Sequence, residues 1–198
     1  MIEAPDVLAA DLQGALGAAD VAAVLLRLVD ADDRTLINRV KALARIVQDS
    51  GAALLLVGRP ELVAPSGADG AHLAGIDAFN AAIPHLKPER IAGAGGFVSR
   101  HDAMLAIEAG ADYVMFGEPD AGGHRPSFEA IIERVEWWAE VFQAPCIGFA
   151  ETLEEIAPLV VAGADFIALG DFVFSDSRGP AATLVAAAER FKLAEPVQ

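Results

Sequence analysis

The stretch Gly110-Ala111-Asp112-Tyr113-Val114-Met115-Phe116-Gly117 decides the fold class of this chain. Its first four residues have two counterparts, Gly67-Ala68-Asp69-Gly70 and Gly163-Ala164-Asp165-Phe166. In each copy the glycine can end a helix in the left-handed conformation, the alanine allows close packing, and the aspartate begins a buried strand. The repeat predicts three equivalent turns from a helix into a parallel strand, at the end of a barrel that serves stability and not chemistry.

Apolar runs of strand length alternate with stretches of helix length along the rest of the chain. The predicted strands are Val21–Leu28, Ala52–Gly58, Gly70–Gly75, Arg90–Gly96, Tyr113–Gly117, Ala144–Ala150 and Phe166–Phe174. The predicted helices are Ala4–Ala19, Arg34–Asp49, Glu61–Ala64, Asp77–Leu86, Ser99–Ala109, Ser127–Phe142, Thr152–Ala162 and Pro180–Leu193. Strands and helices that alternate at this spacing predict parallel βα units in one domain, residues 1–198.

We predict an α/β fold of the (β/α)8 TIM-barrel type. A doubly wound open sheet shows the same alternation, but no glycine-rich dinucleotide fingerprint follows an early strand. Only seven strands are visible, and the segment before Val21 is predicted to be helical. A complete barrel therefore needs a first strand upstream of Met1, or the barrel is open at that point, and the sequence leaves both alternatives open.

The charge of the chain restricts its partners. Its 198 residues carry a net charge of −15, so nucleic acids and anionic membranes would be repelled, and we expect neither as a partner. No apolar run reaches the roughly 18 residues of a membrane span. A small anionic ligand would have to be held locally, by arginines and backbone N–H groups. Homo-oligomer formation is left open.

Two features favour a cytoplasmic location. The N-terminus is acidic and lacks the basic region of a secretory signal. The single cysteine, Cys146, cannot form an internal disulfide, which fits a reducing compartment. We expect Cys146 to be a small apolar residue in a strand.

Four short motifs occur in order along the chain: Leu25-Leu26-Arg27, Ala68-Asp69-Gly70-Ala71-His72-Leu73, Ala109-Gly110-Ala111-Asp112-Tyr113-Val114 and Ile147-Gly148. In this order they resemble thiamine phosphate synthases and the related thiazole tautomerases, over nearly the whole chain from Val21 onward. The resemblance implies a transferase of thiamine biosynthesis. In that family a Mg²⁺-bound hydroxymethylpyrimidine diphosphate ionises to a pyrimidine cation, which the nitrogen of a thiazole phosphate captures at the strand C-termini.

The resemblance implies a substrate site that is partly changed in this chain. Only Arg27 is kept from the family's Gln-x-Arg-x-Lys motif. The family's Asn-Asp metal motif falls on Val57-Gly58, followed by Arg59, and its second metal aspartate matches Asp77. The Thr-x-Thr-Lys loop keeps a cation as Arg125. The implied contacts to diphosphate are therefore Arg27, Arg59 and Arg125, with a Mg²⁺ site weakened to Asp77.

The implied phosphate-binding loops are changed as well. Their backbone positions are Gly148 and Gly170, but the family's Gly-Gly pair reads Gly148-Phe149 and its Ser-Ala pair reads Asp171-Phe172. Phe149 fills space that a glycine leaves for the phosphate, and Asp171 places an anion beside an anion. We therefore predict that thiamine phosphate synthesis is reduced or lost.

The glycine-rich loop after the fifth predicted strand is a candidate for a modified site. It contains Glu118, Asp120 and His124, and the chemistry of barrels lies in such loops. His72, inside a strand, is interpreted as a packed histidine rather than a catalytic one. Asp77 has the alternative reading of a helix N-cap.

Two alternative functions stay open at this point. One is a non-catalytic barrel that binds a phosphate ligand or has a regulatory role. The other is a thiazole tautomerase-like enzyme, although the position of that branch's catalytic histidine is occupied by Val98 here. Dependence of the activity on Mg²⁺ would separate the transferase from a binding protein.

Overall fold

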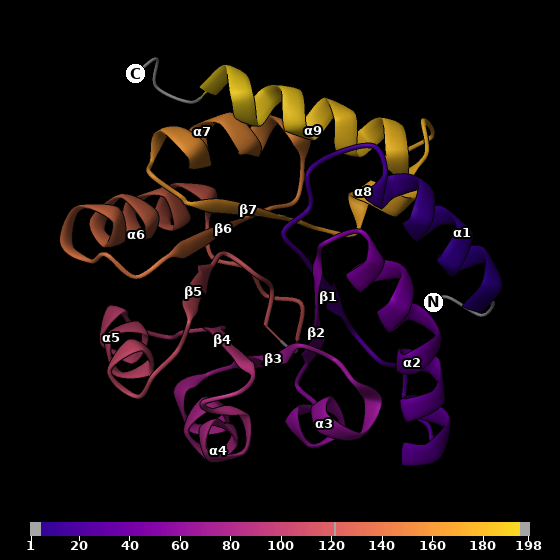
Figure 1. Ribbon diagram of the computed structural model, residues 1–198. Coiled ribbons are helices and arrows are strands. Elements are labelled where there is room, and N and C mark those ends of the chain that lie inside the picture. The colour runs from indigo at the N-terminus through magenta and orange to yellow at the C-terminus, as the bar shows by residue number, and fades with distance from the viewer. Residues whose placement is uncertain (1–4, 121, 195–198) are drawn as a thin grey trace.

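The computed structural model describes residues 5–120 and 122–194. Seven parallel strands form one sheet in the sequential order β1 to β7, and helices lie outside the ring of strands (Figure 1). The strands are β1 (Ala23–Leu26), β2 (Ala53–Val57), β3 (Gly70–Ala74), β4 (Ile91–Gly95), β5 (Tyr113–Phe116), β6 (Cys146–Ala150) and β7 (Phe166–Leu169). A doubly wound sheet would reverse its strand order, so the predicted barrel architecture is confirmed.

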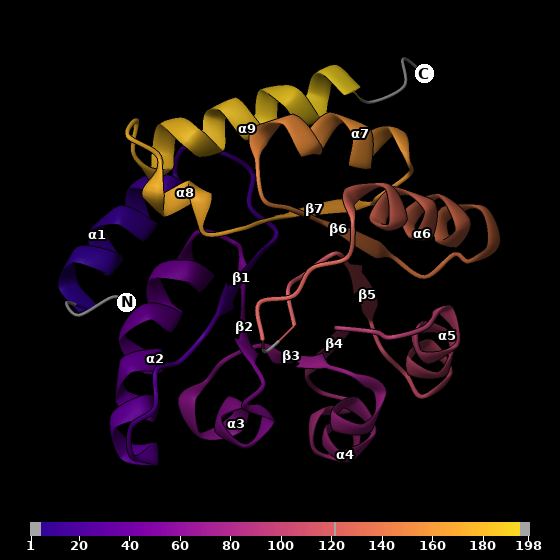
Figure 2. The ribbon, with the colours of Figure 1, turned by 180° about the vertical axis from the view of Figure 1, so that it is seen from behind.

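The barrel is not closed. Ladders join each strand to the next, but within the described residues none joins β7 to β1. Figure 2 shows the same arrangement from behind, with the early and late strands on either side of the opening. The prediction of seven strands, with α1 (Pro5–Leu16) in place of an earlier strand, is confirmed.

The remaining helices follow the predicted alternation closely. They are α2 (Asp33–Asp49), α3 (Val63–Ser66), α4 (Ile76–Leu86), α5 (Arg100–Glu108), α6 (Phe128–Val141), α7 (Ile156–Val161), α8 (Phe172–Ser175) and α9 (Pro180–Ala194), with 3-10 turns η1 (Pro60–Leu62) and η2 (Leu153–Glu155). None of the helices that the structure describes is both long and apolar enough to cross a membrane.

One predicted boundary is wrong. The last strand was expected to reach Phe174, but it ends at Leu169 and α8 follows. Asp171 takes up helical dihedral angles, φ −62° and ψ −14°, which turn the chain out of the sheet. The apolar run after it then buries Val173 while Phe174 stays about half exposed, as expected for a short surface helix.

Alternation along the strands separates two cores. Leu54 and Leu56 of β2 pack outward among the helices, together with Trp138 of α6, whereas Leu55 between them faces the barrel interior. Trp138 is fully buried and its neighbour Trp137 is partly buried. The inner wall is apolar and consists mainly of Leu25, Leu55, Ile91, Met115, Ile147, Phe149 and Ala168.

The aspartates of the repeat hold neighbouring strands together. The backbone N–H groups of Leu54, Ala92 and Cys146 donate to the carboxylates of Asp69, Asp112 and Asp165, each over 2.8 Å. In return, the N–H groups of these aspartates donate to the carbonyl oxygens of the same three residues over 2.9–3.0 Å. Each aspartate therefore clamps one strand pair, β2–β3, β4–β5 or β6–β7, at its N-terminal end.

We predict that Asp112→Ala lowers the free energy of unfolding by about 1.5–3 kcal/mol, because the N–H group of Ala92 and the ammonium of Lys87 lose a charged acceptor. Urea unfolding followed by circular dichroism measures this. Asp49→Ala is the control, since the one ion pair that the described residues give Asp49 is with exposed Arg45, and its loss should change stability by less than about 0.5 kcal/mol. Equal effects of the two substitutions would contradict the clamp.

Candidate functional site

A cavity of about 1440 Å³ occupies the barrel interior. Its lining includes the inner wall, the C-terminal ends of β1 and β7, and residues of α1 and α9 beside the opening of the barrel. Arg27, Glu118, Gly170 and Asp171 all line this cavity. The structure therefore brings these four sequence-predicted residues to one cavity, at the end of the barrel where βα loops carry chemistry.

Three buried polar side chains form a column inside the barrel. The Nδ1 atom of His72 lies 3.0 Å from the hydroxyl oxygen of Tyr113, and its Nε2 atom lies 3.0 Å from both carboxylate oxygens of Glu118. The exposed fractions are 1% for His72, 8% for Tyr113 and 9% for Glu118. His72 is thus packed, as the sequence predicted, but it also holds Glu118 against the cavity.

Two glycines of β4 make room for this column. A Cβ atom on Gly93 would lie 2.0 Å from the ring of Tyr113, and one on Gly95 would lie 2.1 Å from a carboxylate oxygen of Glu118. The inner face of β4 beyond Ile91 therefore carries no side chain. Sequence reasoning missed the column, although a histidine in an apolar strand followed by a strand with alternate glycines was the available signal.

The protons of the column can be assigned from its contacts. Burial, and next the negative charge of Glu118, raise the pKa of Tyr113, so its hydroxyl stays protonated. In one arrangement every donor meets an acceptor: the Tyr113 O–H donates to Nδ1 of His72, and the Nε2–H of His72 donates to Glu118. We assign this arrangement of donors and acceptors to the column.

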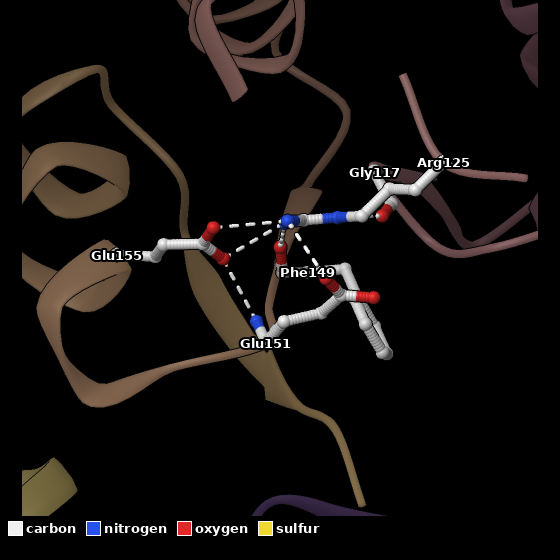
Figure 3. A network of polar contacts seen from close by, with 5 residues as sticks. All are labelled: Gly117, Arg125, Phe149, Glu151 and Glu155. Carbon is white, nitrogen blue, oxygen red and sulfur yellow. Dashed lines mark hydrogen bonds and ion pairs between the residues drawn. The ribbon is translucent and has the colours of Figure 1, made fainter. Parts of the chain in front are cut away.

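Arg125 is occupied by protein acceptors (Figure 3). Its Nε–H donates to the carbonyl oxygen of Gly117, and one terminal nitrogen donates to the carbonyl oxygen of Phe149. The two terminal nitrogens also bind Glu155 in a bidentate pair, both over 2.9 Å, and one of them reaches Glu151 over 3.3 Å. These five contacts use the five N–H donors of a guanidinium. Arg125 therefore connects the C-terminal parts of β5 and β6 to η2.

The other two predicted arginines are arranged differently. Arg59 binds the carboxylates of Glu61 and Asp33, and its side chain is 27% exposed. Arg27 is exposed on the cavity lining, and the part of the chain that the structure describes gives it no ion pair. Arg27 therefore has the more available guanidinium of the two.

The remaining predicted site residues lie apart from the column. Asp77 is exposed in the first turn of α4, where Gly75 and not Asp77 occupies the N-cap position. Asp120 accepts the N–H groups of Gly122 and His124, which closes its own loop. Gly148 lies in the middle of β6, and a Cβ atom there would contact Leu159 of α7, so this glycine faces away from the cavity.

The described residues do not build a magnesium site. Within residues 5–120 and 122–194, no group of three or more His, Cys, Asp or Glu side chains is placed to hold a metal ion. Asp77 is the one carboxylate that matches the family's metal pair, since its partner position is Val57-Gly58. Mg²⁺ usually needs one or two carboxylates together with substrate phosphates. The described residues therefore do not form a Mg²⁺ site by themselves, and Asp77 would be one carboxylate of a weakened site that substrate phosphates complete.

A family model and the curated relatives agree on one family. The family model described as thiamine monophosphate synthase matches residues 3–178. The thiamine-phosphate synthase of Rhodospirillum centenum is 40% identical over 188 residues, which cover 91% of this chain and 88% of the relative. That of Hyphomonas neptunium is 36% identical over 180 residues, with coverages of 87% and 81%.

A solved structure supports the fold. The thiamine phosphate pyrophosphorylase of Pyrococcus furiosus superposes with a TM-score of 0.78 and covers 94% of this chain and 90% of its own length. Its sequence identity is 18%, so this likeness shows the barrel fold alone.

We predict that Arg125→Lys lowers the free energy of unfolding by about 2 kcal/mol or more, because an ammonium cannot replace the bidentate pair and both carbonyl contacts. Urea unfolding measures the loss, and amide hydrogen exchange of residues 117–120 should become faster. Arg178→Lys is the matched control, since that arginine pairs with Asp176 at the surface. Unchanged stability of Arg125→Lys would refute the scaffold role.

Proposed function

We propose that this chain, which belongs to the thiamine monophosphate synthase family, acts in thiamine biosynthesis as a thiamine phosphate synthase-like enzyme of low turnover. It joins a hydroxymethylpyrimidine diphosphate to a thiazole phosphate. The observation that carries this proposal is the family match over residues 3–178, together with a cavity whose lining includes the C-terminal ends of β1 and β7. No observation favours the binding-protein or tautomerase alternatives over it.

Arg27 and Arg59, which follow the C-terminal ends of β1 and β2, support binding of a diphosphate. Arg27 lines the cavity without an ion pair in the described residues, and Arg59 is held by two carboxylates that remain partly exposed. Guanidinium groups bind phosphate oxygens in pairs and neutralise the charge that a departing diphosphate carries. On a chain with net charge −15, these cations are the local attraction that an anionic substrate needs.

The altered phosphate loops support a low rate. The N–H group of Gly170 donates to the carbonyl oxygen of Ala150, so it is not available to a phosphate oxygen. Phe149 occupies the adjacent inner wall, and Asp171 adds a negative charge to the cavity lining. A phosphate cradle that consists of backbone N–H groups is thus weak here.

The apolar wall has a role in this reaction as well. A pyrimidine cation reacts readily with water, and Leu55, Met115 and Ile147 line part of the cavity with apolar side chains that offer water no hydrogen-bond partner. Because the residues present do not fit a protein-built Mg²⁺ site, we assign no step to a metal ion.

We predict turnover below about 1 s⁻¹ with both substrates in the presence of Mg²⁺, since the phosphate cradle and one metal carboxylate are missing. Thiamine phosphate formation followed by chromatography measures the rate. Turnover typical of enzymes, at or above about 1 s⁻¹, would contradict the proposed loss of rate. Complete absence of product after prolonged incubation would contradict the proposed synthase activity itself.

We predict that Arg59→Ala weakens binding of inorganic pyrophosphate by about tenfold or more, because one bidentate charged contact is lost. Calorimetric titration with and without Mg²⁺ measures the affinity. Arg45→Ala is the control, since Arg45 is an exposed residue near the C-terminal end of α2. If wild type and Arg59→Ala bind equally, or neither binds, Arg59 serves only its ion pairs.

A further inference from the structure

We infer that the Glu118 carboxylate forms an electrostatic subsite inside the barrel for a positively charged heteroaromatic ring. From the sequence, Glu118 was predicted only to belong to a loop that could carry a modified site. The structure turns its side chain inward, onto His72 and into the lining of the cavity. The identity of the ring that it meets rests on the proposed function.

Glu118 is 9% exposed, and its one ion-pairing neighbour in the described part of the chain is the imidazole of His72. The Nδ1 atom of this imidazole accepts the hydrogen bond of the Tyr113 hydroxyl, so its Nε2–H is the donor directed at the carboxylate. Among the described residues, no Lys or Arg forms an ion pair with the Glu118 carboxylate. A buried carboxylate of this kind attracts a cation from the cavity.

Glu118 lies among apolar side chains of the inner wall. The inner wall is formed by apolar side chains such as Leu55, Met115 and Ile147, so the effective dielectric constant around Glu118 is low. An ionised carboxylate offers about four lone-pair positions, and the single Nε2–H of His72 uses part of them. The other positions remain for a ligand. Gly95 contributes by leaving space for the carboxylate that any side chain would fill.

The proposed reaction places positive charge first on the pyrimidine ring and then on the thiazolium ring. When the C–O bond to the diphosphate breaks, its electron pair leaves with the diphosphate, and the pyrimidine ring gains a positive charge. The lone pair of the thiazole nitrogen then forms the new C–N bond, and the positive charge moves to the thiazolium ring of the product. A fixed carboxylate that faces the cavity stabilises this charge where it develops. Glu118 thus acts at the cationic end, whereas the arginines act at the diphosphate.

His72 and Tyr113 are positioning residues in this scheme. They hold the carboxylate over β4 through a continuous chain of hydrogen bonds, and the rings of the two residues stack with centroids 5.7 Å apart. A purely structural column would fix the same contacts but would give no preference between charged and neutral ligands. This difference makes the inference testable by binding, independently of turnover.

The test compares two ligands of nearly the same shape. One is thiamine phosphate, whose thiazolium ring is cationic, and the other is its analogue in which the charged ring nitrogen is replaced by carbon. Calorimetry should give wild type a preference of about tenfold or more for the cation. Glu118→Gln, which keeps an acceptor for His72, should reduce the preference to less than about threefold. Glu136→Gln on the outer face of α6 should behave as wild type.

Thermal unfolding of Glu118→Gln verifies that the variant is folded. Equal affinity of wild type for the two ligands, or a full preference retained by Glu118→Gln, would overturn the subsite. If the wild-type protein forms product but binds the two ligands equally, the inferred subsite is wrong and the proposed function stands. If it binds neither ligand and forms no product, the proposed function fails and the subsite fails with it.

Discussion

The strand register of this barrel depends on three carboxylates. Asp69, Asp112 and Asp165 accept the N–H group of the neighbouring strand and donate their own N–H group back to it. Register decides which side chains face inward, since a shift by one residue would exchange the two faces of a strand. The position of His72 in the interior, and of its neighbours Ala71 and Leu73 among the helices, follows from this pairing.

Much of the fold could be predicted from the sequence because its signals are local. Helix caps, apolar runs and the repeated turn each depend on neighbouring residues, and they placed the strands and helices to within a few residues. The end of the last strand was missed because Phe172-Val173-Phe174 has the composition of a strand, and only the backbone at Asp171 decides that it is helical. The resemblance to the family could be recognised for the same reason, because it depends on the order of short motifs along the chain.

The candidate site was less predictable because it depends on partners that are distant in the chain. The sequence gives the residue type of Arg125 but not that Glu155, thirty positions later, binds its guanidinium. Likewise, Glu118 lies in a loop by sequence, and only the arrangement of β3, β4 and β5 directs it toward His72. Residue types can be matched to a motif, whereas the availability of their charges is set by tertiary contacts.

The absent side chain of Gly95 has a consequence for how this protein can change. Its missing Cβ atom would stand 2.1 Å from one oxygen of Glu118 and 2.9 Å from Nε2 of His72, so three positions on separate segments share one small volume. A larger residue at 95 is tolerated only if position 118 becomes shorter or turns outward, and that second change alone would leave a void beside the imidazole. Positions 95 and 118 are therefore expected to change together. A substitution at either position alone would destabilise this part of the barrel, whereas the two combined could be tolerated.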